Sequence, residues 1–100
     1  MEPMDALLAL VVVVGAPVVE ELVYRSYIQA RLEPLTSRAW AVVITSVWFT
    51  LVHLEPVEFP GLFAFAVVLG VCFARTRRIG MSLVAHVAFN LTGLVFVLST

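Results

Sequence analysis

The sequence predicts an all-α protein, a polytopic transmembrane bundle of about four helices that forms a single unit over residues 1–100. Hydrophobic residues make up 62% of the chain and charged residues 13%. A soluble domain of this length cannot bury so much apolar surface, because small domains keep a large share of their surface exposed. We therefore expect an integral, multi-pass membrane protein surrounded by lipid. The net charge of −1 gives no general attraction to nucleic acid, so we expect no such partner.

Four apolar segments follow one another along the chain. The first covers about 5–32 and stops before Pro34, because the residue before a proline is disfavoured in a helix. It is rich in valine, but a lone strand in lipid would leave its backbone unpaired, which favours a helix. The others cover about 37–54, 59–75 and 81–98, and a stretch with two prolines separates the second from the third. The second and third are at the short end of the 17–25 residues that suit a bilayer.

Arginine placement predicts the orientation in the membrane. Arg31 and Arg38 flank the first turn, and Arg75, Arg77 and Arg78 fill the third, whereas the N-terminus and the second turn carry no lysine or arginine. Basic short loops stay on the cytoplasmic side. Four helices with both basic turns inside would place both termini outside.

Several polar side chains interrupt the apolar helices, and ionisable residues within membrane spans are rare and usually functional. They are Glu20, Glu21, Arg25, His53, His86 and Asn90. A rise of about 1.5 Å per residue places Glu20 on the first helix, His53 on the second, and His86 with Asn90 on the fourth about 12 to 22 Å from the basic edge. We therefore expect Glu20, His53, His86 and Asn90 to share one layer of the bundle.

Helical spacing assigns different roles to the two acids. Arg25 lies four residues after Glu21, so these two should form a structural ion pair. Glu20 then has no cation on its own helix, and its nearest candidate partner is a histidine from another helix. His86 and Asn90 are also four apart and should face one direction.

Proline and phenylalanine add two further expectations. Pro17 has no N–H and clashes with the carbonyl of Val13, so the first helix should kink there and free a carbonyl that needs a partner. Phe49 lies one turn before His53, and we interpret it as a packing residue.

Three short motifs together resemble a known family. The stretches "EELVYR", "FTLVH" and "HVAFN" fit E-E-x-x-x-R, F-x-x-x-H and H-x-x-x-N, in that order and on successive helices. This pattern is similar to that of the CPBP family, which contains the type II CAAX prenyl endopeptidases and bacterial relatives linked to bacteriocin processing or self-immunity. The resemblance covers about residues 15–95. Ser26 departs from it, since glycine often follows the arginine of the motif, and family members usually have more helices. The chain thus looks like the catalytic core of a larger fold.

The resemblance implies an intramembrane endopeptidase that cleaves a peptide or protein substrate. By analogy, Glu20 with His53 would activate a water molecule, and His86 with Asn90 would stabilise the oxyanion. Donors aimed at a developing oxyanion are also what unaided chemistry requires of such a site.

The catalytic type and two rival functions stay open at this point. Glu20, His53 and His86 form a two-histidine, one-glutamate set that could hold Zn²⁺, although the H-E-x-x-H pattern is missing. Both a glutamate-type and a metal-dependent mechanism remain. A catalytically silent immunity or scaffold protein is one alternative. A small proton or ion-relay transporter subunit is another, but ionisable residues confined to one layer favour a closed site over a channel.

Overall fold

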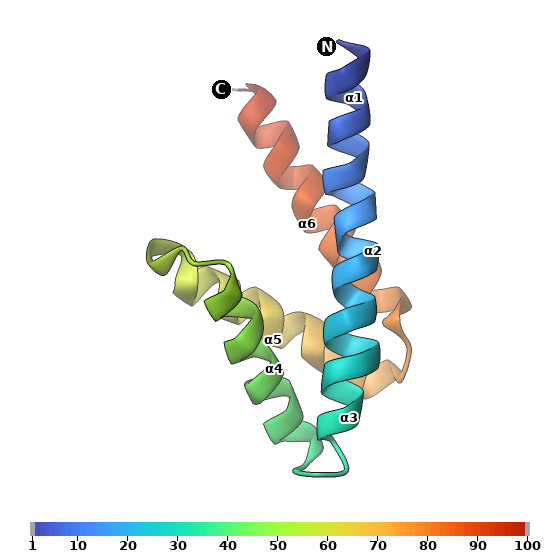
Figure 1. The fold of residues 1–100 in the computed structure, drawn as a ribbon, viewed down its shortest axis with the longest axis vertical. Coiled ribbons are helices and arrows are strands. Elements are labelled where there is room, and N and C mark those ends of the chain that lie inside the picture. Colours follow the sequence, from blue (N-terminus) through green and yellow to red (C-terminus); the bar gives the residue numbers. More distant parts are fainter. Residues whose placement is uncertain (1, 100) are drawn as a thin grey trace.

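The computed structural model describes residues 2–99, which are almost entirely helical and contain no strand (Figure 1). The first helix runs without interruption over Pro3–Leu32. Within it, α1 (Pro3–Leu10), α2 (Ala16–Glu21) and α3 (Ala30–Leu32) are separated by two π-helical stretches. These stretches cover Val11–Gly15 and Leu22–Gln29. The predicted all-α class is confirmed.

The disturbance expected at Pro17 takes the form of the first π-helical stretch. The N–H of Ala16 bonds to the carbonyl of Val11, five residues back instead of four. Pro17 follows as the second residue of α2. The chain therefore accommodates the proline by widening the preceding turn, and the helix continues through this point in Figure 1.

The other helices begin and end close to the predicted positions. The helix α4 covers Arg38–Val52, and the Ser37 hydroxyl caps it by accepting the N–H of Trp40 at 3.0 Å. A 3₁₀ turn, Pro56–Glu58, leads into α5 (Phe59–Thr76), and α6 covers Ile79–Ser99. The reversals after α4 and α5 contain residues with left-handed backbone, Leu54 at φ 55° and Arg77 at φ 60°.

The core lies where the lower half of the first helix meets α4 and α5 (Figure 1). Its buried apolar residues come chiefly from α4 and α5, namely Ala41, Val42, Phe49, Ala66, Leu69 and Phe73. Several of these are small, which lets helices approach closely in a membrane bundle. The upper half of the first helix packs against α6 and extends with it beyond the other two helices.

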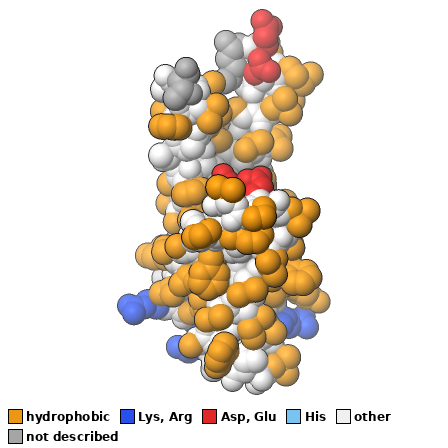
Figure 2. All heavy atoms as spheres, turned by 90° about the vertical axis from the view of Figure 1, so that its left-hand side faces the viewer, with side chains coloured by type: hydrophobic (Ala, Val, Ile, Leu, Met, Phe, Trp, Pro, Cys, Tyr) orange, Lys and Arg blue, Asp and Glu red, His pale blue; other side chains and the backbone are white. Residues whose placement is uncertain are grey.

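The outer surface is that of a membrane protein. Three helical segments are long and apolar enough to cross a bilayer: Pro3–Leu32, Pro56–Thr76 and Ile79–Ser99. The fourth apolar helix, α4, is shorter, with 15 residues. Figure 2 shows mostly hydrophobic side chains, with arginines toward the lower end and acidic side chains at the upper end and near mid-height. An integral, multi-pass location in the membrane is confirmed.

A surface ion pair ties two turns together at the arginine-bearing end. Arg77 donates to both carboxylate oxygens of Glu33, at 2.8 and 2.6 Å. Glu33 directly follows α3, and Arg77 ends α5. The turns on either side of the α4–α5 hairpin therefore lie at the same end of the bundle.

Candidate active site

A buried polar stripe runs along the first helix. Glu21, Arg25 and Gln29 follow one another at a spacing of four, and none of them exposes any side-chain surface. Arg25 Nε lies 3.5 Å from Glu21 Oε1, so the structure contains the ion pair that the spacing predicts. Burying two charges in this way requires further polar partners, because the desolvation cost is large.

Those partners are backbone carbonyl groups of α5. Arg25 Nη2 donates to the carbonyl of Ala66 at 3.2 Å, and Gln29 Nε2 donates to that of Gly70 at 3.0 Å. The close approach depends on glycine at position 70. A Cβ there would lie 3.0 Å from Gln29 Oε1 and 3.0 Å from a methyl group of Val42. The stripe thus fastens the first helix to α5 at two successive turns.

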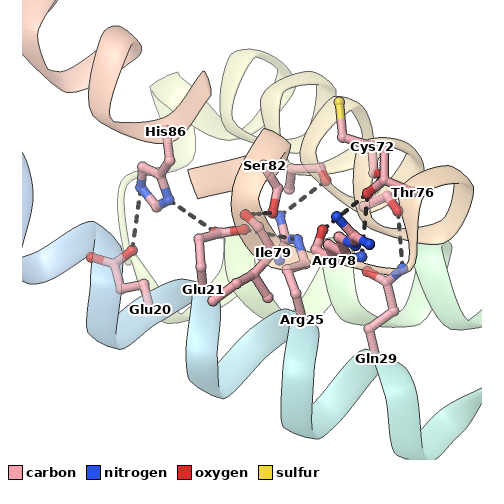
Figure 3. Close-up of polar contacts among 12 residues, drawn as sticks. Glu20, Glu21, Arg25, Gln29, Cys72, Thr76, Arg78, Ile79, Ser82 and His86 are labelled. Atoms are coloured by element: carbon pink, nitrogen blue, oxygen red, sulfur yellow. Dashed lines mark hydrogen bonds and ion pairs between the residues drawn. The ribbon is translucent and has the colours of Figure 1, made fainter. Parts of the chain in front are cut away.

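His86, from α6, is the centre of the candidate site (Figure 3). It is 3% exposed, and its Nδ1 lies 2.9 Å from Glu21 Oε2. Its Nε2 lies 3.7 Å from Glu20 Oε2. Arg25, Glu21, His86 and Glu20 therefore form one line of alternating positive and negative groups when the imidazole is protonated. Glu21 holds His86 as well as Arg25, a contact that helical spacing alone did not predict.

The two adjacent glutamates have different surroundings. The Glu21 side chain is fully buried between Arg25 and His86. The Glu20 side chain is 31% exposed, and within residues 2–99 its ion pair with His86 is its one polar contact. Glu20 therefore has carboxylate oxygen left for a water molecule or substrate, and Glu21 has much less.

His53 lies at the end of α4 and is oriented by its own helix. Its Nδ1 is 2.6 Å from the carbonyl of Phe49. Since a carbonyl can only accept, Nδ1 carries the proton, and Nε2 of the neutral ring is then a free acceptor. No hydrogen bond or ion pair joins His53 to Glu20 in the part of the chain that the structure describes. The pair expected from the sequence is thus not in direct contact.

Phe49 connects the two histidines. Its ring centroid is 4.6 Å from that of His53 and 6.2 Å from that of His86, and Tyr24 packs edge-on against it at 5.2 Å. Only 1% of Phe49 is exposed. The residue is a packing residue, as the sequence predicts, and its ring packs against both imidazoles.

Asn90 lies one turn beyond His86 on α6 and contacts the first helix. Its Nδ2 donates to the carbonyl of Val12 at 3.2 Å. The side chain is half-buried. Asn90 makes no hydrogen bond to Glu20 or to either histidine among the described residues. It shares their helix–helix interface but not their polar chain.

The structure does not assemble the zinc set considered from the sequence. Within residues 2–99, no three side chains of His, Cys, Asp or Glu are arranged to hold a metal ion. His86 has both nitrogens directed at carboxylates, and His53 lies beyond Phe49. The donors present do not fit a zinc site, and we derive no catalytic step through one.

Sequence reasoning missed two residues that shape the site. Gln29 continues the Glu21–Arg25 spacing by one more turn, and a polar amide at that spacing in an apolar helix indicates a buried polar contact. Phe65 packs edge-on against His86 at 5.3 Å and stacks on Phe89 at 4.1 Å. Nothing in the sequence distinguishes Phe65 from the other aromatic residues of these helices.

Comparison with known proteins agrees with this architecture. No protein of curated function and no solved structure matches the chain. A family model does match, over residues 2–92, and its description is type II CAAX prenyl endopeptidase, Rce1-like. The match spans both glutamates of the first helix, both histidines and Asn90. This chain belongs to the Rce1-like type II CAAX prenyl endopeptidase family, a family of membrane proteases.

Proposed function

We propose that the chain is an intramembrane endopeptidase of the glutamate type, in which Glu20 acts as the general base. The observation that carries this proposal is the difference between the neighbouring acids. Glu21 is fully buried and engaged by Arg25 and His86, whereas Glu20 is 31% exposed and, among the described residues, has its one polar contact with His86, at 3.7 Å. A general base must reach a water proton, and Glu20 has the free oxygen to do so.

In the proposed reaction, Glu20 takes a proton from a water molecule, and the oxygen of that water attacks the carbonyl carbon of the scissile peptide bond. His53 supports this step through Nε2, which the hydrogen bond from Nδ1 to Phe49 leaves as an acceptor for the second water hydrogen. Glu20 then delivers its proton to the leaving amine. Closing the gap between Glu20 and His53 requires the water and substrate that bridge them.

His86 and Asn90 would stabilise the oxyanion. A His86 ring protonated on both nitrogens donates to Glu21 through Nδ1 and retains an N–H at Nε2 for the substrate oxygen. Glu21 is then a positioning residue, since it fixes the ring's orientation. The Asn90 amide has two N–H groups, of which the Val12 carbonyl uses one. The second is free to donate to the substrate.

The family and the lipid surroundings support a proposal for the substrate class. The helices are embedded in lipid, so a substrate that itself partitions into the membrane would reach Glu20 directly. We infer that a peptide with a prenylated C-terminal segment is the substrate to test first.

The deciding experiment measures cleavage of a farnesylated peptide by the purified protein in liposomes. Glu20→Gln should abolish cleavage while insertion and thermal stability stay close to those of the parent protein. Asp5→Asn is the matched control, because Asp5 is an exposed acid on the same helix, and it should leave turnover unchanged. Retained cleavage in Glu20→Gln would remove Glu20 from the mechanism. Cleavage that a chelator stops would favour a metal-dependent route instead.

A further inference from the structure

We propose that Pro17 is a positioning residue for Asn90, acting through the carbonyl group of Val12. Because it has no N–H, Pro17 leaves that carbonyl without a backbone donor, and the carbonyl then holds the Asn90 amide. The hydrogen bond itself is independent of any activity. Its catalytic consequence rests on the function proposed above, in which Asn90 donates to the oxyanion.

The hydrogen-bond register before Pro17 identifies the free carbonyl. In the π-helical stretch, the Ala16 N–H bonds to the carbonyl of Val11, five residues back. The next N–H in this register would come from residue 17 and would bond to Val12. Proline cannot supply it. The widened turn thus moves the unpaired carbonyl from Val13, where an α-helical register would leave it, to Val12.

An unpaired carbonyl inside a bilayer has a strong requirement for a donor. The hydrocarbon of the bilayer offers no hydrogen-bond donor, so an unsatisfied backbone group that faces it is strongly unfavourable. The donor comes from a residue 78 positions away, Asn90 on α6, whose Nδ2 lies 3.2 Å from the Val12 oxygen. The two helices pack against each other at this level, as Figure 1 shows.

The bond fixes the orientation of the Asn90 amide. Only the nitrogen side can face a carbonyl oxygen, so the amide cannot flip, and its second N–H points in one defined direction. Asn90 lies four residues after His86, which the Glu20 and Glu21 carboxylates hold from the same first helix. Two contacts one turn apart on α6 thereby align both proposed oxyanion donors with the first helix.

The test combines Pro17→Ala with Asn90→Leu, which keeps the side-chain size and removes the donor. In the parent protein, Asn90→Leu strands the Val12 carbonyl and should lower the unfolding temperature. In the Pro17→Ala background, the new N–H of residue 17 can pair with the carbonyls of that turn. In that background, Asn90→Leu should lower the unfolding temperature by less than it does in the parent protein. Pro60→Ala is the control, because a proline in the first turn of α5 replaces an N–H that has no helical partner.

A spectroscopic reading tests the hydrogen bond directly. An isotope label on the Val12 carbonyl should show an infrared stretch that moves to higher frequency in Asn90→Leu. The stretch should return toward the parent value in the double variant. An unchanged infrared band in Asn90→Leu would overturn the proposal. So would an equal drop in unfolding temperature on adding Asn90→Leu to the parent protein and to Pro17→Ala.

Kinetics test the catalytic consequence separately. Asn90→Leu should lower kcat about 10²- to 10³-fold with little change in KM, as for loss of an oxyanion donor. Pro17→Ala should lower kcat by up to about 10²-fold, since it releases the donor's orientation. The double variant should be no slower than Asn90→Leu alone. Losses that multiply would refute the positioning role. If the parent protein cleaves no peptide, the proposed function fails, while the stability and infrared results still decide the Val12 contact.

Discussion

The buried ion pair of the first helix allows a sharp test of how charge is stabilised in this bundle. Glu21→Gln removes a negative charge from a pair in which neither side chain is exposed. Arg25 would keep its hydrogen bond to the Ala66 carbonyl and its position over the Phe49 ring, 5.7 Å from the centroid. Neither contact neutralises the guanidinium. Stranding a buried charge in this way costs about 3–5 kcal/mol.

The matched control is the same substitution in the other glutamate–arginine pair. Glu33→Gln breaks the contact with Arg77, whose side chain is 46% exposed, so water can solvate the released guanidinium. An exposed pair contributes about 1 kcal/mol or less. The difference between the two Glu→Gln variants therefore compares a buried pair, whose glutamate also contacts His86, with a pair whose arginine is solvated.

The assay is unfolding in mixed micelles, followed through the tryptophan fluorescence of α4. We expect Glu21→Gln to lose several times more stability than Glu33→Gln. Adding Arg25→Met to Glu21→Gln should restore part of the loss, because neither charge then remains buried. Equal losses in the two single variants would refute the reasoning, and so would a double variant less stable than Glu21→Gln alone.

Two further predictions concern a helix contact and the surface pair. Gly70→Ala should destabilise the fold by about 1–3 kcal/mol, because its Cβ would lie 3.0 Å from Gln29 Oε1. A Cβ at position 93 would have no contact within 4 Å in the described structure, so Gly93→Ala should be neutral or stabilising by up to about 1 kcal/mol. A Gly93→Ala variant less stable than Gly70→Ala in the unfolding assay would contradict this. The hydrogen bond from Arg77 lowers the pKa of Glu33 below its value of 4.5 in an unfolded chain. Its contribution to stability is therefore complete above pH 4.5 and is lost as pH falls through the lowered pKa. A pH titration of unfolding should show this loss, and Glu33→Gln should remove it.

The helix boundaries were predictable because the bilayer and the local sequence impose them. Pro34 ends the first helix within two residues of the predicted position, and the hydroxyl of Ser37 caps α4. The Glu21–Arg25 contact follows from a spacing of four, which brings side chains together in nearly any helix. These features depend on neighbours along the chain, so they need no knowledge of the tertiary structure.

Contacts between helices depend on the rotation of each helix about its axis, which depth does not determine. Depth predicts that Glu20, His53, His86 and Asn90 share one layer, but it does not predict which of them meet. Glu20 contacts His86, whereas His53 turns to the carbonyl of Phe49. The partner of Asn90 required more still. The Asn90 amide binds the carbonyl of Val12, next to a π-helical turn, whereas an α-helical register would free the carbonyl of Val13. Hydrophobic patterning carries no information about such a shift.

Gln29 has a consequence for the site although it lies about two turns after Glu21, the residue that contacts His86. Arg25 donates to Ala66 and Gln29 to Gly70, so both contacts join residues 41 positions apart. Equal offsets mean that the first helix and α5 run in the same direction here, in a register fixed at two points. Phe65 precedes Ala66, so this register also places its ring against His86. A slip of α5 by one turn would replace Gly70 at its close contact with Gln29 and Val42, and it would withdraw that ring. The polar stripe therefore sets the position of the apolar wall of the site, in addition to neutralising charge.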